Sequence, residues 1–177
     1  MVKKSDHTSI QACELPSNAL LRRYLSEGAY ADCYVTEVPR MISHAEYVEA
    51  FYTTAVFKLE RLLLSWFVLR PSTDAQAGEL ALGTRASFAA WSVAARESNQ
   101  LLLCDFQGRT RSWLMTAAGS NTQTTRLFFG SAVVRRVDST RQARMGFAFR
   151  ALLGFHKLYS RILLSAAVKR IYSSRPV

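Results

Sequence analysis

The sequence is short of cysteine, and its cysteines are far apart. Cys13, Cys33 and Cys104 are the three present in 177 residues, and none belongs to a CxxC pair or to a Cys/His spacing that could hold zinc. Their odd number suits a reducing compartment better than a disulfide scaffold. We therefore expect neither a structural zinc site nor a disulfide framework.

Long apolar runs are also missing. The N-terminus, MVKKSDHTSIQAC, begins with basic residues, but no apolar stretch of signal-peptide length follows it. Near the C-terminus the longest apolar stretch, residues 162–168, is far short of the ~20 residues that a membrane span needs. These absences predict a cytoplasmic protein without a transmembrane segment.

Acidic residues almost disappear from the C-terminal part of the chain. Residues 106–177 contain 13 Lys and Arg but one acidic residue, Asp138, whereas residues 1–105 contain 10 Lys and Arg and 12 Asp and Glu. This asymmetry underlies the net charge of +10. It is typical of a protein that meets an anionic partner, and it is equally compatible with a solvated basic face.

Motifs for well-known chemistry are absent as well. The sequence contains no GxGxxG, Walker, GxSxG or HExxH pattern, so dinucleotide, nucleotide, serine-hydrolase and metalloprotease chemistry lack support. It also has no helix-turn-helix, RNP or zinc-finger spacing. We expect no cofactor and no metal, and nucleic acid is not the favoured partner.

The length and the 49% hydrophobic content fit one globular domain, residues 1–177. We place its folded core at residues 15–172, between flexible tails at 1–14 and 173–177. Within the core, residues 15–28 predict a short helix entered at Ser17. Residues 29–39 predict a strand in which Cys33 and Tyr34 lie on opposite faces.

Two capping boxes mark the next helices. The sequence SHAE at 43–46 predicts the start of a helix, and apolar residues at helical spacing extend it to Arg70. The sequence TDAQ at 73–76 predicts a second, shorter helix that ends at Gly83. His44, inside the first box, is expected to be exposed.

From Phe88 the apolar residues recur with a period near two, between short turns. This pattern predicts an antiparallel meander, since such short connections join neighbouring strands. The chain then closes with a long helix over residues 145–171. The expected fold class is α+β: an antiparallel β-sheet meander packed against a long C-terminal helix, with two helices inserted after the first strand. The four strands of the meander are expected at residues 88–97, 100–106, 109–117 and 124–137.

The C-terminal helix has two different faces. Arg150, Lys157 and Arg161 fall within about 20° of one line on a helical projection, and apolar residues lie opposite them. Covering the apolar face of the sheet is the plainer role for such a helix. The alternative is a surface in which these three residues meet an anionic lipid membrane.

Three segments carry a family resemblance: ADCYVTEVP, AFYTTAVFKLERLLL and FRALLGFHKLYSRILL. With the order of elements, they resemble the helix-grip fold of the START-like or SRPBCC superfamily. More narrowly, they are similar to a bacterial family of unknown function near that superfamily. The resemblance covers roughly residues 29–172 and implies an apolar cavity between the sheet and the last helix. The sequence predicts five strands, where the superfamily typically has six or seven.

Aromatic residues and one histidine are the candidates for lining such a cavity. His156 could act there as an acid or base, although a structural histidine bonded to a carboxylate or carbonyl is the plainer interpretation. Asp105 has two explanations, an ion pair with Arg109 or Arg111 across a turn, or a carboxylate in the cavity, and the strand register decides between them. The candidate lining residues are Tyr34, Trp91, Trp113, Phe129, Phe155, His156 and Tyr159.

Three functions remain open at this point. The first is a non-catalytic domain that binds an apolar or lipid-like small molecule, which requires a connected cavity of at least ~300 Å³. The second is a cyclase-like or dehydratase-like enzyme that uses His156, Asp105 or Tyr34 as an acid or base. The third is a basic interaction module for anionic lipid or nucleic acid. The sequence indicates neither a substrate nor an oligomeric state.

Overall fold

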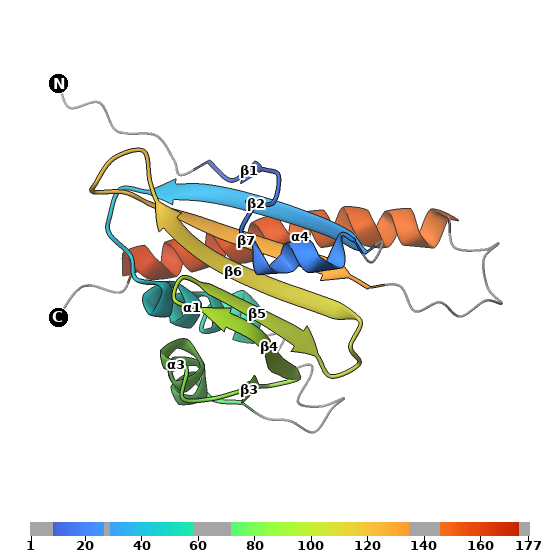
Figure 1. Ribbon diagram of the computed structural model, residues 1–177, viewed down its shortest axis with the longest axis horizontal. Coiled ribbons are helices and arrows are strands. Elements are labelled where there is room, and N and C mark those ends of the chain that lie inside the picture. Colours follow the sequence, from blue (N-terminus) through green and yellow to red (C-terminus); the bar gives the residue numbers. More distant parts are fainter. Residues whose placement is uncertain (1–8, 27–28, 59–71, 135–145, 174–177) are drawn as a thin grey trace.

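The computed structural model describes residues 9–26, 29–58, 72–134 and 146–173, the first part of the last range (146–157) as backbone alone. These residues form strands and helices in the α+β arrangement shown in Figure 1. The elements are β1 (Gln11–Ala12), η1 (Leu20–Tyr24), β2 (Tyr30–Val38), α1 (His44–Tyr52), α3 (Asp74–Leu82), β3 (Ser87–Phe88), β4 (Trp91–Glu97), β5 (Gln100–Asp105), β6 (Thr110–Ala118), β7 (Thr125–Val133) and α4 (Gly146–Ser173).

The strands form one seven-stranded antiparallel sheet in the order β1-β2-β7-β6-β5-β4-β3. The predicted meander is therefore confirmed, and β2 closes it by pairing with β7 along its whole length. Two short strands that the sequence did not reveal, β1 and β3, extend the two edges. They are too short to produce an alternating pattern of their own, because each has two residues.

The two faces of the sheet carry different cores. Helices α1 and α4 pack on one face, which includes Tyr34 and Phe129, and the helix-covered face holds the larger cluster. On the opposite face, η1 packs against a smaller cluster that includes Cys33 and Trp113. The predicted alternation in β2 is confirmed, because Cys33 and Tyr34 belong to opposite clusters. Figure 1 shows η1 and α4 on opposite sides of the sheet.

The expected continuous helix from Ser43 to Arg70 is interrupted: α1 ends at Tyr52, residues 53–54 leave the helix, and residues 55–58 are helical again. The Thr53 hydroxyl donates to the Glu49 carbonyl at 2.8 Å, and the Thr54 hydroxyl donates to the Phe51 carbonyl at 3.0 Å. Threonine hydroxyls that bond to the backbone in this way compete with the regular helical ladder. The last part of the expected helix, residues 59–70, lies outside the described residues.

The N-terminal segment also differs from expectation. Instead of a helix entered at Ser17, the chain forms the five-residue 3₁₀ helix η1, with Ala19 at its N-cap. The expected tail, residues 1–14, includes β1, which pairs with β2. Pairing with β2 satisfies backbone groups that an isolated tail would leave to water.

The two capping boxes have different outcomes. At α3 the box is complete, because Thr73 and Gln76 bond each other's backbone, and Gly83 ends the helix with a φ of 82°. At α1 the Ser43 hydroxyl accepts from the Glu46 amide at 3.1 Å, but the Glu46 carboxylate accepts instead from the Arg40 guanidinium at 2.5 Å. In the described parts of the chain, no helix combines the length and apolarity needed to cross a bilayer.

Candidate functional site

A cavity of about 250 Å³ lies on the helix-covered face of the sheet, beside α4. Its walls come from the sheet and from the helices that cover it, so only the folded chain creates it. The volume falls short of the ~300 Å³ that the binding hypothesis required from the sequence, so the cavity suits only ligands smaller than that hypothesis assumed. The lining residues are Phe51, Phe57, Ala90, Trp91, Asp105, Phe106, Thr110, Arg111, Ser112, Phe129, Ser131, Tyr159, Ser160 and Leu163.

Aromatic rings form one wall of the cavity. Phe51 of α1 lies 4.9 Å, centroid to centroid, from Phe129 of β7, and it makes an edge contact with Tyr52 at 5.2 Å. Phe57 contacts Tyr52 at 4.8 Å and stacks on Phe88 at 6.2 Å. Such ring pairs hold one another in defined positions, so this wall is shaped before any ligand arrives.

Hydroxyl groups line the sheet side of the same cavity. Ser112 and Ser131 are direct partners on β6 and β7, and Asp32 is the partner of Ser131 on β2. The Ser131 hydroxyl bonds the Asp32 carboxylate at 2.5 Å, and the Ser112 hydroxyl lies 3.3 Å from the Tyr52 hydroxyl. A row of polar groups therefore crosses the helix-covered face of the sheet.

Two buried polar atoms in the cavity wall have no hydrogen-bond partner among the described residues: the indole nitrogen of Trp91 and the hydroxyl oxygen of Ser160. The Arg111 Nε is in the same condition, but its guanidinium lies 4.6 Å from the centroid of the Tyr24 ring, on the opposite face of the sheet. Burying a polar group without a partner costs about 1–3 kcal/mol. Because both residues line the cavity, they are the candidate hydrogen-bonding groups of its wall.

Asp105 lines the cavity at the end of β5. Its carboxylate oxygen Oδ1 accepts from the backbone amides of Arg109 at 2.7 Å and Thr110 at 3.1 Å. The carboxylate therefore closes the β5–β6 turn, and no ion pair with Arg109 or Arg111 occurs among the described contacts. Asp105 therefore lines the cavity, as one of its two explanations required, and its carboxylate also stabilises the β5–β6 turn.

The structure separates the predicted lining residues. Trp91, Phe129 and Tyr159 line the cavity. Tyr34 lies on the same face but lines a neighbouring surface groove, and Trp113 lies on the opposite face, where it cannot line the cavity. The side chains of Phe155 and His156 lie outside the described residues.

Three serines that line the cavity, Ser112, Ser131 and Ser160, are not among the residues predicted from the sequence. A signal existed for Ser131, which interrupts the apolar residues Phe129 and Val133 on the inward-facing positions of β7. Ser112 lies between Thr110 and Leu114 on β6 and gives no such signal. Ser160 shares its helix with Tyr159 and Leu163 and was hidden by the apolar residues around it. Polar residues at inward positions are therefore the better indication of this site than the aromatic residues.

The proposed basic stripe can be placed in part. Arg161 is exposed, and its guanidinium donates to the Ile10 carbonyl at 3.0 Å, so it ties the N-terminal segment to α4. The side chains of Arg150 and Lys157 lie outside the described residues.

His44 is buried, contrary to expectation. The pKa of His44 is lowered to about 4, chiefly because the side chain is removed from water; a backbone hydrogen bond with Leu114 opposes this, and the nearby charge of Arg96 adds to the lowering. His44 is therefore neutral at pH 7. The helix N-terminus at which it stands is packed against the sheet, which a local sequence pattern does not show.

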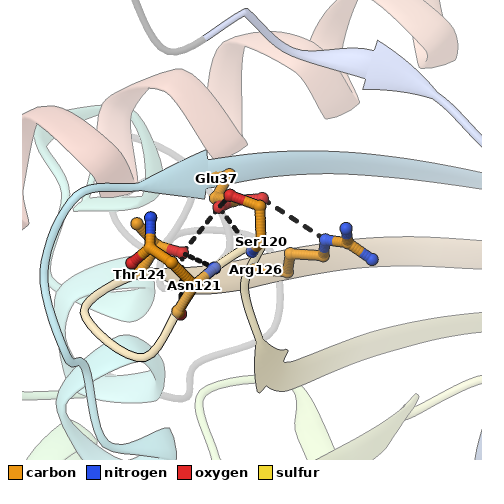
Figure 2. A network of polar contacts seen from close by, with 5 residues as sticks. All are labelled: Glu37, Ser120, Asn121, Thr124 and Arg126. Atoms are coloured by element: carbon orange, nitrogen blue, oxygen red, sulfur yellow. Dashed lines mark hydrogen bonds and ion pairs between the residues drawn. The ribbon is translucent and has the colours of Figure 1, made fainter.

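A second polar cluster holds the β6–β7 turn against β2 (Figure 2). None of the residues labelled in Figure 2 lines the cavity. The Glu37 carboxylate accepts from the Ser120 hydroxyl at 2.6 Å, the Thr124 hydroxyl at 2.6 Å and the Ser120 amide at 2.7 Å. These bonds lower the pKa of Glu37 to about 2. Because every partner is already used in joining the turn to the strand, this cluster is structural.

The described residues contain no group of three or more His, Cys, Asp or Glu side chains that could hold a metal ion. Comparison of the chain with protein-family models, with curated proteins and with solved structures finds no match. The cavity is therefore the main structural evidence on function.

Proposed function

We propose that this protein is a non-catalytic binding domain, of a helix-grip-like fold, that holds an apolar small molecule between the sheet and α4. The observation that carries the proposal is the cavity of about 250 Å³ lined mainly by aromatic and apolar side chains. The strand order β2-β7-β6-β5-β4-β3, with helices after β2 and a long final helix, supports the helix-grip assignment. Such cavities bind apolar ligands by removing their surface from water.

The polar atoms of the wall refine the class of ligand. The Trp91 indole offers an N–H donor, and the Ser160 hydroxyl can donate or accept. A guest that carries one hydrogen-bond acceptor, such as a carbonyl oxygen, on a compact apolar body would use both features. The modest volume favours a ligand smaller than most drugs or full-length lipids.

Neither alternative function gains support from a specific observation. The enzyme hypothesis needs an acid or base free to act, whereas the described Asp105 oxygen Oδ1 is held by two backbone amides. The membrane or nucleic-acid hypothesis needs an unoccupied basic stripe, whereas Arg161 bonds the Ile10 carbonyl. A cytoplasmic location is part of the proposal and rests on the sequence alone.

The experiment uses a pair of probes that differ in one group, 2-decanone and decane, with the full-length protein labelled with ¹⁵N. We expect 2-decanone to shift the indole N–H resonance of Trp91 and to leave that of Trp113 unchanged, because the Trp113 nitrogen already donates to Gln100 on the other face. Decane should bind more weakly, since it leaves the Trp91 donor without a partner.

A cavity-filling variant tests the location. Leu163→Trp places a larger side chain in the cavity wall and should weaken 2-decanone binding at least about tenfold, a loss of ~1.4 kcal/mol. Leu82→Trp is the matched control, because Leu82 is exposed at the end of α3 and does not line the cavity. Equal binding by both variants, or a shift of the Trp113 resonance alone, would contradict the proposal.

A further inference from the structure

The fold brings together two cysteines that are twenty positions apart in the sequence. Cys13 follows β1 and Cys33 lies in β2, and the Cys13 amide donates to the Cys33 carbonyl at 3.0 Å. Continuing the register of β1 and β2 makes these two residues direct neighbours across the strands. Their sulfur atoms lie 3.2 Å apart and share a hydrogen bond.

We propose that Cys13 and Cys33 are an oxidisable dithiol, which a hydroperoxide converts to an intramolecular disulfide that fastens β1 to β2. Directly opposed residues in antiparallel strands have Cα atoms about 4.5 or 5.5 Å apart, and both separations fall in the range that a disulfide accepts. The sulfur atoms must approach by only about 1.1 Å to reach the bonded distance. This inference does not depend on the proposed ligand-binding function.

The surroundings assign different roles to the two sulfur atoms. Both cysteines line an open groove of about 520 Å³, but Cys13 is half-buried whereas Cys33 is buried, so a small oxidant reaches Cys13 more easily. The hydrogen bond with the Cys33 thiol lowers the pKa of Cys13, and burial opposes this in part. The same hydrogen bond and burial raise the pKa of Cys33. Cys13 is thus the nucleophile and Cys33 the resolving thiol.

The reaction has two steps. The Cys13 thiolate attacks the terminal oxygen of the hydroperoxide, the O–O bond breaks, and the products are a sulfenic acid on Cys13 and an alcohol, or water from hydrogen peroxide. The Cys33 sulfur then attacks the sulfenic sulfur, and the departing hydroxide takes the Cys33 proton and leaves as water. Two thiols are oxidised to one disulfide, and one peroxide bond is reduced.

The bond would fix a segment that weak contacts now hold. β1 has two residues, and the Ile10 carbonyl beside it accepts from Arg161 of α4. A covalent link at Cys13 would keep this segment at the edge of the sheet and next to α4. In a reducing compartment such disulfides are transient and respond to oxidants, as expected of a redox-sensitive site.

The test starts from the reduced full-length protein and one equivalent of hydrogen peroxide. We expect the free thiols to fall from the three in the sequence to one, Cys104. The mass should fall by two hydrogen atoms, and a peptide map should link Cys13 to Cys33. Dithiothreitol should reverse the change, and the oxidised form should melt roughly 6–12 °C higher, since the link restrains the unfolded chain.

Three serine variants separate the roles. Cys33→Ser should stop at a sulfenic acid on Cys13 that dimedone captures, and Cys13→Ser should leave Cys33 unreacted. Cys104→Ser is the matched control and should form the disulfide normally, because Cys104 is also half-buried but its thiol donates to the Asp105 carbonyl at 3.3 Å.

Several results would overturn the proposal. These are a disulfide that joins two chains, oxidation of Cys104 as fast as Cys13, or no reaction of the folded protein at peroxide levels that oxidise the unfolded chain. If the serine variants do not fold, differential alkylation of the wild-type thiols decides the question without them.

Discussion

Buried polar groups on the two faces of the sheet differ in whether they have hydrogen-bond partners: those of Gln100 on one face are paired, and some of those around the cavity on the other face are not. The Gln100 side chain is fully buried, and both its ends are saturated: Oε1 accepts from the Leu20 amide and the Trp113 indole, and Nε2 donates to Asn18 and Glu97. In the cavity, the Trp91 indole is buried without a partner among the described residues.

This difference provides a criterion for distinguishing polar groups that stabilise the fold from polar groups that could bind a ligand. A saturated network such as that of Gln100 contributes to the fold and has nothing left to offer a ligand. A buried donor without a partner lowers the stability of the free protein, and a ligand that reaches it would supply the missing hydrogen bond. Trp113 of β6 and Trp91 of β4 are the same residue type on opposite faces of one sheet, with β5 between their strands. The Trp113 indole has an acceptor, and the Trp91 indole has none among the described residues.

The largest expected effect on stability comes from Gln100→Leu, which keeps the approximate size of the side chain and removes its polar atoms. The Leu20 amide and the Trp113 indole would then be buried without their acceptor. We expect a loss of about 4 kcal/mol in the free energy of unfolding, at about 1–3 kcal/mol for each unsatisfied group. Urea unfolding measures this loss. A change below ~1 kcal/mol would show that the network is not structural.

Acid provides the next largest effect, through His44, whose Nε2 is also buried without a partner among the described groups. Because burial lowers the pKa of His44 to about 4 from 6.5, the unfolded chain binds the proton first as the pH falls. Stability should be complete above pH 6.5 and should fall by ~3 kcal/mol between pH 6.5 and 4. In His44→Leu that decline should be absent. A wild-type stability that stays flat over this range would contradict the burial of His44.

Substituting the two tryptophans compares a bonded buried indole with an unbonded one. Trp113→Phe removes a bonded indole from a packed core and should cost about 2 kcal/mol. Trp91→Phe removes a donor without a partner, so the free energy of unfolding should change by less than ~1 kcal/mol, while 2-decanone binding weakens. Urea unfolding with and without 2-decanone distinguishes the two. Equal losses of stability in both variants would mean that Trp91 is as well satisfied as Trp113.

The smallest effect concerns Glu37, a saturated carboxylate near the surface. Its folded pKa of about 2 lies below the ordinary 4.5, so its contribution is present above pH 4.5 and is lost as the pH falls from 4.5 toward 2. Glu37→Gln should flatten stability in this window, which lies below that of His44. Glu49→Gln, on the exposed side of α1, is the control. Identical dependence of stability on pH in Glu37→Gln and the wild type would show that the Glu37 hydrogen bonds do not stabilise the fold.

Much of the fold could be predicted from the sequence because its signals are local. The alternation of residues 91–133 gave the meander, and the box at Thr73 with Gly83 gave both ends of α3. Where competing local bonds form, the prediction of one continuous helix from Ser43 was wrong: the Thr53 and Thr54 hydroxyls interrupt it after Tyr52, and residues 55–58 are helical again. β1 had no signal of its own, because two residues form a strand only when β2 offers an edge.

The sequence by itself determined the α+β class, the antiparallel order of the meander and the final helix, since residue periodicity and turn residues act over a few positions. Only the tertiary structure decided which side chains meet. It placed Trp91 and Trp113 on opposite faces, because the faces depend on the strand register, which cannot be read from the sequence. It set Cys13 beside Cys33 and buried His44 by contacts between elements distant in the chain. Burial and pairing depend on such contacts, and the candidate chemistry depends on burial and pairing.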